Sequence, residues 1–149
     1  MQGEELKFYF CGSIRGGRQL ASDYQKIIEM MKLHGLVLTE HLGDDQVIES
    51  KDRILTDVQI HDRDMDWVRE SDLVVAEVTI PSLGVGYEIG RAIELGKPVL
   101  CLFRSDIGFT LSAMIAGSEG VRPLTYEGLD ELPEKIGEFI SERAPRRTS

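Results

Sequence analysis

A short apolar segment followed by a proline and a run of glycines constrains the fold of this chain more than any other feature. The segment 73–76 is apolar and rich in β-branched residues, which is typical of a strand buried on both faces of a sheet. Pro81 ends this pattern, and Gly84, Gly86 and Gly90 follow at the start of a predicted helix. The pattern predicts one βα unit, whose loop lies at the edge where α/β proteins build their active sites.

Strands and helices alternate along the rest of the chain. The expected strands span residues 6–11, 36–38, 73–76, 99–103 and 121–124, with helices between them and from Pro133 onward. Residues 56–59 form a capping box that opens a helix, and residues 43–55 are a polar, acidic loop. The alternation predicts an α/β fold: a single-domain, doubly wound (Rossmann-like) parallel five-stranded sheet with helices on both faces. We expect this domain to span residues 1–142 and residues 143–149 to be a disordered basic tail.

Charge and hydropathy exclude several classes of function. The 149-residue chain has a formal net charge of −9, which argues against binding of nucleic-acid polymers because these require a basic surface. A single nucleotide remains compatible with that charge. The N-terminus lacks the pattern of a signal peptide, and no apolar segment is long enough to span a bilayer. We therefore expect no membrane partner and a cytoplasmic location, and import into the nucleus stays open.

The cysteines and histidines indicate neither a disulfide nor a metal site. Cys11 and Cys101 each fall within or at the end of an apolar, strand-like run, where a reduced and packed thiol is expected. The three histidines are scattered, and no spacing typical of metal ligands occurs.

Glu88 is the first candidate for chemistry. It is expected in the first turn of the helix after Pro81, where the helix dipole would favour its ionised form. The neighbouring glycines allow a close approach of backbone N–H groups to a phosphate. Glu88 is therefore a candidate anionic nucleophile beside a phosphate cradle. The alternative is a glutamate that only begins a helix on a tight loop.

Asp64 is the second candidate carboxylate. At about 100° per residue, Asp64 falls on an apolar arc with Ile60 and Trp67, whereas Asp62 and Asp66 point the opposite way. A carboxyl group in such surroundings needs a partner or a raised pKa, and a raised pKa would suit a general acid. The alternative is a buried aspartate that caps a neighbouring loop.

The loop after the first strand, residues 12–17, resembles a phosphate-binding turn. It fits neither the dinucleotide nor the Walker pattern, so an NAD site is not expected. Ser13 and Arg15 could bind an anion, although such a turn often has no ligand. Tyr9 lies near the carboxyl edge of the sheet, where its hydroxyl could reach the cleft or simply belong to the core. Glu77 is a rival carboxylate, but tying loop backbone together is its expected role.

Several of these segments carry a resemblance to a known family. They are residues 9–18, 61–67, 76–92, 100–104 and 111–115. They closely resemble the 2′-deoxynucleoside 5′-monophosphate N-hydrolases of the nucleoside 2-deoxyribosyltransferase superfamily. The likeness covers most of the chain between residues 8 and 117, whereas residues 43–55 and the C-terminal tail match no pattern of the family.

The resemblance implies roles for individual residues. Glu88 corresponds to the nucleophile, Asp64 to the general acid/base and Tyr9 to the residue that orients the nucleophile. Ser112 corresponds to a phosphate-site residue contributed by the second subunit of a homodimer. The remaining substrate-binding positions are Ser13, Ile14, Arg15, Gly16, Ile60, Ser82 and Gly84, of which Ile14 and Ile60 would line the base.

The resemblance also implies an activity. We expect hydrolysis of the N-glycosidic bond of 2′-deoxynucleoside 5′-monophosphates to free base and 2-deoxyribose 5-phosphate, through a covalent glycosyl-enzyme on Glu88 and without a metal or other cofactor. The preferred base stays open between a purine and a modified pyrimidine such as 5-hydroxymethyluracil. Two alternatives remain: a nucleoside 2-deoxyribosyltransferase, in which a second base replaces water, and a non-catalytic nucleotide-binding module.

Overall fold

The protein is described by a computed structural model that covers residues 5–14, 20–39 and 55–144. Four features predicted from the sequence lie outside these residues. They are Arg15, Gly16, nearly all of the loop 43–55, and the tail from residue 145 onward.

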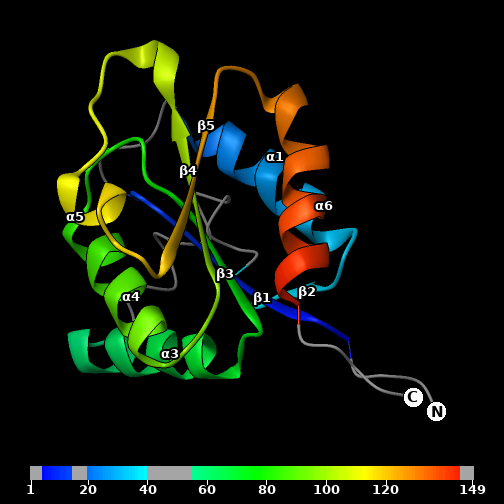
Figure 1. Cartoon of the computed structure of the whole chain (residues 1–149). Helices are drawn as coiled ribbons and strands as arrows, with labels where there is room; N and C mark the ends of the chain where they lie inside the picture. Colours follow the sequence, from blue (N-terminus) through cyan, green and yellow to red (C-terminus); the bar gives the residue numbers. More distant parts are fainter. Residues whose placement is uncertain (1–4, 15–19, 40–54, 145–149) are drawn as a thin grey trace.

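The described strands form one parallel sheet in the order β2-β1-β3-β4-β5 (Figure 1). The strands are β1 (Lys7–Gly12), β2 (Leu36–Val37), β3 (Leu73–Glu77), β4 (Val99–Arg104) and β5 (Val121–Tyr126). All five residues of β3 are buried, as expected for a strand covered on both faces. The strand order places β1 and β3 side by side at the centre, so the loops that follow them meet at one edge of the sheet.

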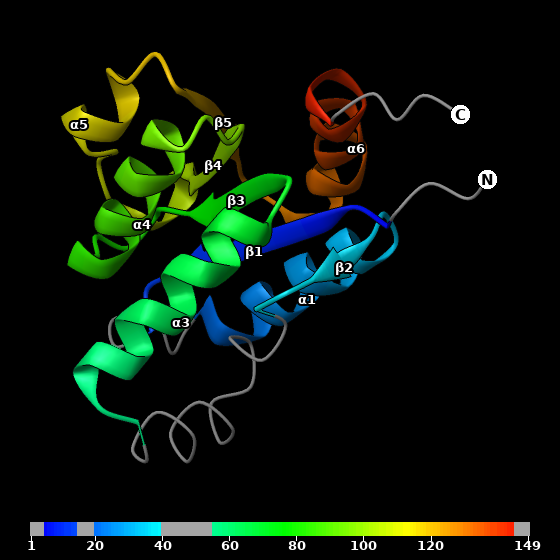
Figure 2. The same cartoon turned by 90° about the horizontal axis from the view of Figure 1, so that it is seen from below.

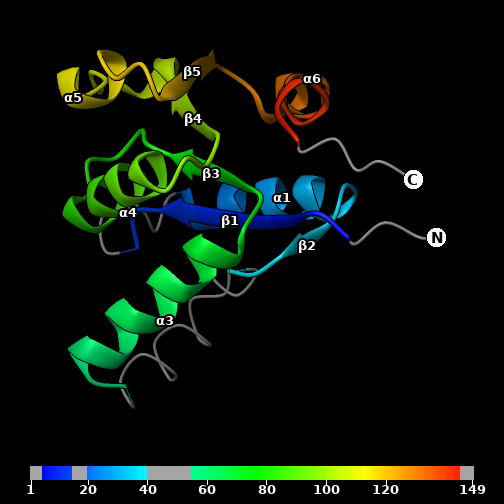
Figure 3. The same cartoon turned by 60° about the horizontal axis from the view of Figure 1, so that its bottom comes forward.

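Helices cover both faces of the sheet, and the predicted fold class is confirmed. One face packs against α1 (Ala21–Lys32) and α6 (Leu132–Arg143), and the other against α3 (Asp57–Glu70) and α4 (Leu83–Glu94). Figure 2 shows α3 and α4 next to each other, and Figure 3 shows α3 and α6 on opposite sides of the sheet. The other elements of the described residues are α5 (Ala113–Ala116) and two short 3₁₀ helices, η3 (Ser105–Ile107) and η4 (Leu129–Glu131).

The start of α3 is set by the capping box predicted from the sequence. The Thr56 hydroxyl accepts a hydrogen bond from the Gln59 backbone N–H, and the Gln59 side chain accepts one from the Thr56 N–H. The two bonds satisfy donors that the first turn of a helix leaves free. The helix that carries Asp64 therefore begins at a defined residue.

The alternation of side chains along each strand separates two environments. Tyr9 and Cys11 belong to the core beneath α3 and α4, whereas Phe10 and Tyr126 belong to the core beneath α1 and α6. Cys11 and Cys101 are both free and buried, as the sequence predicts. No helix among the described residues is both long and apolar enough to cross a membrane.

Candidate active site

Tyr9 and Glu88 meet at the carboxyl edge of the sheet. Tyr9 comes from the middle of β1 and is almost fully buried, and its hydroxyl donates a hydrogen bond to Oε2 of Glu88 on α4. Burial and the nearby negative charge of Glu88 both raise the pKa of Tyr9, so the phenol keeps its proton and acts as a donor. The contact fixes one oxygen of Glu88.

The position and ionisation of Glu88 differ from the sequence-based prediction. The helix α4 begins at Leu83, after the N-cap residue Ser82, so Glu88 is in the second turn and not in the first. The helix dipole acts mainly within the first turn, and it therefore does little for this carboxylate. The pKa of Glu88 is raised to about 7, mainly by burial and in smaller part by the nearby charge of Asp64, against the opposing effects of the Tyr9 hydrogen bond and Arg63. The prediction that Glu88 stays readily ionised was wrong.

Asp64 faces the site as predicted, but its surroundings are more polar than the apolar arc suggests. Its side chain is 24% exposed, whereas those of Asp62 and Asp66 are 66% and 76% exposed. Nε and Nη2 of Arg63 both lie 3.0 Å from Oδ1 of Asp64. This cation stabilises the carboxylate form of Asp64. The expectation that Asp64 holds its proton because of apolar neighbours therefore omits an ion pair that favours the opposite state.

Arg63 is the functional candidate that the sequence reasoning missed. Its guanidinium contacts Asp64 and lies over the ring of Trp67, 4.9 Å from the ring centroid. Its charge also opposes the rise in the pKa of Glu88. The signal was present in the sequence, since an arginine directly precedes the candidate acid. Adjacent residues of a helix point about 100° apart, so periodicity alone does not predict the contact. The long Arg63 side chain nevertheless bends toward Asp64.

Ser82 and Gly84 lie next to Glu88, in the loop that the sequence predicts to bind phosphate. The Ser82 hydroxyl accepts a hydrogen bond from the Val85 N–H at 3.3 Å and caps α4. A Cβ atom placed on Gly84 would lie 3.9 Å from both Ser82 Oγ and Glu88 Oε1. The Ser82 hydroxyl and Oε1 of Glu88 thus flank a position without a side chain, and a larger residue there would occupy the space between them.

The other predicted substrate positions fall around the same edge. Ser13 follows β1 and is buried, Ile14 is 48% exposed, and Ile60 on α3 is partly buried one turn before Asp64. Arg15 and Gly16 lie outside the described residues. The carboxyl edge of the sheet therefore holds residues of α3 and α4 together with three residues of the β1 segment, which are Tyr9, Ser13 and Ile14.

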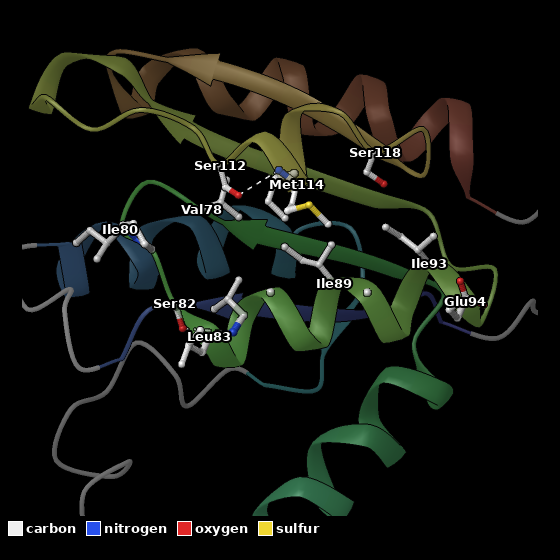
Figure 4. Close-up of a pocket in the computed structure, with 15 residues that line it drawn as sticks. Val78, Ile80, Ser82, Leu83, Ile89, Ile93, Glu94, Ser112, Met114 and Ser118 are labelled. Carbon is white, nitrogen blue, oxygen red and sulfur yellow. Dashed lines mark hydrogen bonds between the residues drawn. The ribbon is translucent and has the colours of Figure 1, made fainter.

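Ser112 lies across a groove from Ser82. The groove has a volume of about 690 Å³ and separates the loop 78–82 and α4 from α5 (Figure 4). Its lining is mostly apolar, and Leu83 and Met114 on its walls are 97% and 83% exposed. Tyr9, Asp64 and Glu88 do not line it. The groove is therefore adjacent to the carboxylate pair and distinct from it.

Glu77 plays the role predicted for it rather than that of a second nucleophile. It is fully buried at the end of β3 and faces the α1–α6 side of the sheet, opposite to Tyr9. It accepts a hydrogen bond from the Thr79 backbone N–H at 2.8 Å. Among the described residues, no group of three or more His, Cys, Asp or Glu side chains is arranged to hold a metal ion.

Comparison with known proteins places this geometry in a family. A 5-hydroxymethyl-dUMP N-hydrolase from Mus musculus is 54% identical over 130 residues, which cover 86% of this chain and 75% of the relative. One from Danio rerio is 51% identical over 137 residues, covering 92% and 94%. A relative from Nematostella vectensis, provisionally named 2′-deoxynucleoside 5′-phosphate N-hydrolase 1, is 56% identical over 138 residues, covering 91% and 94%.

A solved structure supports the fold. The CMP N-glycosidase BcmB of Clostridium botulinum superimposes with a TM-score of 0.62 at 18% identity, covering 89% of this chain and 98% of that one. Residues 8–122 match the sequence profile described as nucleoside 2-deoxyribosyltransferase, a span that includes Tyr9, Asp64, Glu88 and Ser112. The chain belongs to the nucleoside 2-deoxyribosyltransferase family.

Proposed function

We propose that this protein is an N-glycosidase that hydrolyses 2′-deoxynucleoside 5′-monophosphates to free base and 2-deoxyribose 5-phosphate. The observation that carries the proposal is the hydrogen bond from Tyr9 to Glu88, in a site where Asp64 is close enough to raise the pKa of Glu88. Most glycosidases use a pair of carboxyl groups that flank the bond to be broken. The names of the relatives support the same substrate class, with 5-hydroxymethyl-dUMP as the first candidate.

The proposed reaction is a double displacement at C1′ of the deoxyribose. Tyr9 binds Oε2 of Glu88, and Oε1, on the Gly84 side, attacks C1′ as the bond to the base breaks. The reactive form has Glu88 as the carboxylate and Asp64 protonated, so the proton that the free pair carries on Glu88 moves to Asp64 when the substrate binds, and Asp64 gives it to the departing base. Asp64 then takes a proton from water, the water oxygen attacks C1′, and the ester bond to Glu88 breaks. Because the deoxyribose has no 2′-hydroxyl, the oxocarbenium-like transition state is easier to reach.

The phosphate would be held by the Ser13 and Ser82 segments. Hydroxyl groups and backbone N–H groups at a helix start suit a dianion, and Ser82 lies beside the nucleophile across Gly84. The matching test measures release of free base from deoxynucleoside 5′-monophosphates and from the corresponding deoxynucleosides. We expect kcat/KM to be at least about 100-fold higher for the monophosphates, because two to three charge-assisted hydrogen bonds are lost without the phosphate.

The same assay separates the two alternatives. Addition of an acceptor base should leave the yield of 2-deoxyribose 5-phosphate unchanged for a hydrolase, whereas a transferase would form a new nucleoside or nucleotide. Equal efficiency on a deoxynucleoside and its monophosphate would favour the transferase. Binding without any release of base would favour the non-catalytic module.

We further propose a homodimer in which the apolar groove between α4 and α5 receives the second copy. The exposed Leu83 and Met114 would then be covered, and Ser112 of each subunit would reach the phosphate of the other's site. Exposed apolar side chains that gather along one groove are typical of such contacts. The groove's position beside Ser82 brings the partner to the phosphate side of the site (Figure 4).

Mixed dimers of Ser112→Ala and Glu88→Gln subunits test this arrangement. If each site is composite, the mixed dimer holds one intact site and one doubly altered site, so it should have about half of the wild-type kcat per dimer and a wild-type KM. If Ser112 acts within its own subunit, the working site of the mixed dimer keeps the raised KM of Ser112→Ala. The latter result, in dimers verified by mass, would contradict the shared site.

A further inference from the structure

Glu77 is the only carboxylate among the described residues whose residue is fully buried, and the proposed reaction does not use it. It lies in register with Gly12, at the carboxyl ends of the two central strands β1 and β3. Its side chain is on the α1–α6 side of the sheet, whereas Tyr9 and Glu88 meet on the α3–α4 side. A buried charge at such a position is costly unless hydrogen bonds compensate for it.

The carboxylate of Glu77 accepts three hydrogen bonds. Oε1 accepts from the Thr79 backbone N–H at 2.8 Å, and Oε2 accepts from the Thr79 hydroxyl at 2.9 Å and from the Tyr126 hydroxyl. Burial raises the pKa of Glu77, and these three donors oppose the rise. Two of the three donors belong to Thr79, the second residue of the loop between β3 and α4.

A second layer of contacts holds the same loop from β4. The Arg104 backbone N–H donates to the Thr79 hydroxyl at 2.8 Å. The Arg104 side chain reaches Asp23 on α1 and Asp106 on η3, at 2.8 Å in each case. We call Asp23, Glu77, Thr79, Arg104 and Tyr126 the edge network. It connects β3, β4, β5 and α1 at the carboxyl edge.

We propose that Glu77 is a positioning residue for the phosphate site. By holding both the N–H and the hydroxyl of Thr79, it sets the path of the loop 78–82, which ends in the Ser82 hydroxyl and the start of α4. The inference rests on the proposed function, since it assigns Ser82 to the phosphate. Glu77 acts from the opposite face of the sheet and touches neither the substrate nor Glu88.

Two variants test the proposal, and Glu77→Gln disturbs more of the hydrogen bonds of Glu77 than Tyr126→Phe does. In Glu77→Gln one acceptor oxygen becomes an amide donor, so at least one of the Thr79 groups loses its acceptor. In Tyr126→Phe only the third hydrogen bond is lost. We expect KM for a deoxynucleoside 5′-monophosphate to rise about tenfold in Glu77→Gln and about threefold in Tyr126→Phe, with kcat within about threefold of wild type in both. The dissociation constant of the nucleotide, measured by calorimetry, should rise in parallel.

Ile136→Val is the matched control for lost stability. Ile136 lies on α6, is fully buried in the core beneath α1 and α6, and belongs neither to the loop 78–82 nor to the edge network. It should lower Tm without a change in KM. Unchanged KM and nucleotide affinity in the folded variants, a fall in kcat alone, or an equal rise of KM in Ile136→Val would each overturn the proposal. If Glu77→Gln does not fold, the KM and the nucleotide affinity of Tyr126→Phe decide whether the proposal stands.

The proposed function and this inference can be refuted independently of each other. A wild-type protein that binds nucleotide but releases no base would refute the hydrolase. The calorimetric comparison of wild type with the two variants would still decide whether Glu77 sets the phosphate site.

Discussion

Replacement of Glu88 by Gln is expected to lower kcat by about 10⁴-fold or more, because the nucleophile of a double displacement has no substitute in the site. Tyr9 would still donate to the amide oxygen, so the geometry should change little. Mass spectrometry of the quenched wild-type enzyme should find the 2-deoxyribosyl 5-phosphate adduct on Glu88 and no adduct in the variant. An adduct on Glu77, or full activity of Glu88→Gln, would contradict the assignment.

The same substitution should stabilise the folded protein above pH 7. Burial raises the pKa of Glu88 from its ordinary value of 4.5 to about 7, so between these values the folded chain holds a proton that the unfolded chain releases. The free energy of unfolding of the wild type therefore falls as the pH rises from 4.5 to 7, and the loss is complete above 7. We expect Glu88→Gln to gain roughly 2 kcal/mol at pH 8, a value reduced for the partial exposure of the side chain, and nothing at pH 4.

Chemical denaturation at pH 4 and pH 8 measures this gain. Glu138→Gln is the control, because Glu138 is an exposed glutamate on α6, on the other side of the sheet. It should change neither activity nor the pH dependence of stability. A Glu88→Gln variant that is less stable than wild type at pH 8 would show that Glu88 is not strained by its burial.

The sheet and its edge were predictable because they depend on short-range patterns. A short, fully apolar and β-branched segment such as 73–76 is typical of a strand covered on both faces, and the capping residues of α3 are only three positions apart in the sequence. The parallel βα alternation then brings the ends of β1 and β3 to one edge. The assignment of Tyr9, Asp64, Ser82 and Glu88 to one site came instead from the resemblance to the deoxynucleotide N-hydrolases.

The charge states of the site were not predictable, because they depend on contacts between elements. The pKa of Glu88 depends mainly on how deeply α4 buries it, and no local pattern gives that depth. The ion pair of Asp64 depends on the direction of the Arg63 side chain. The edge network depends on Tyr126, which is 49 residues from Glu77 in sequence. Each of these features needs the tertiary arrangement.

Replacement of Asp64 by Asn is expected to reduce kcat/KM for a deoxynucleoside 5′-monophosphate by about 10²- to 10⁴-fold, the usual contribution of a general acid. The loss should be within about tenfold for a 2-deoxyribosyl 5-phosphate whose leaving group is a nitrophenolate, since that group departs without a proton. Asp66→Asn is the matched control, because Asp66 is two residues away on the same helix and its side chain is 76% exposed. Equal losses on both substrates would show that Asp64 positions the substrate and does not protonate the base.

The pH profile of Asp64→Asn provides a second and independent readout. In the free enzyme Arg63 stabilises the Asp64 carboxylate, and that negative charge contributes to the raised pKa of Glu88. The nucleophile must be ionised, so with the activated substrate, which needs no proton from Asp64, kcat/KM of the wild type should fall as the pH drops below about 7. Asn carries no charge, and the pKa of Glu88 should fall in the variant, which moves the acid limb measured with the activated substrate to lower pH. An acid limb that stays in place would mean that the two carboxyl groups do not interact, and the division of labour between them would then have to be abandoned.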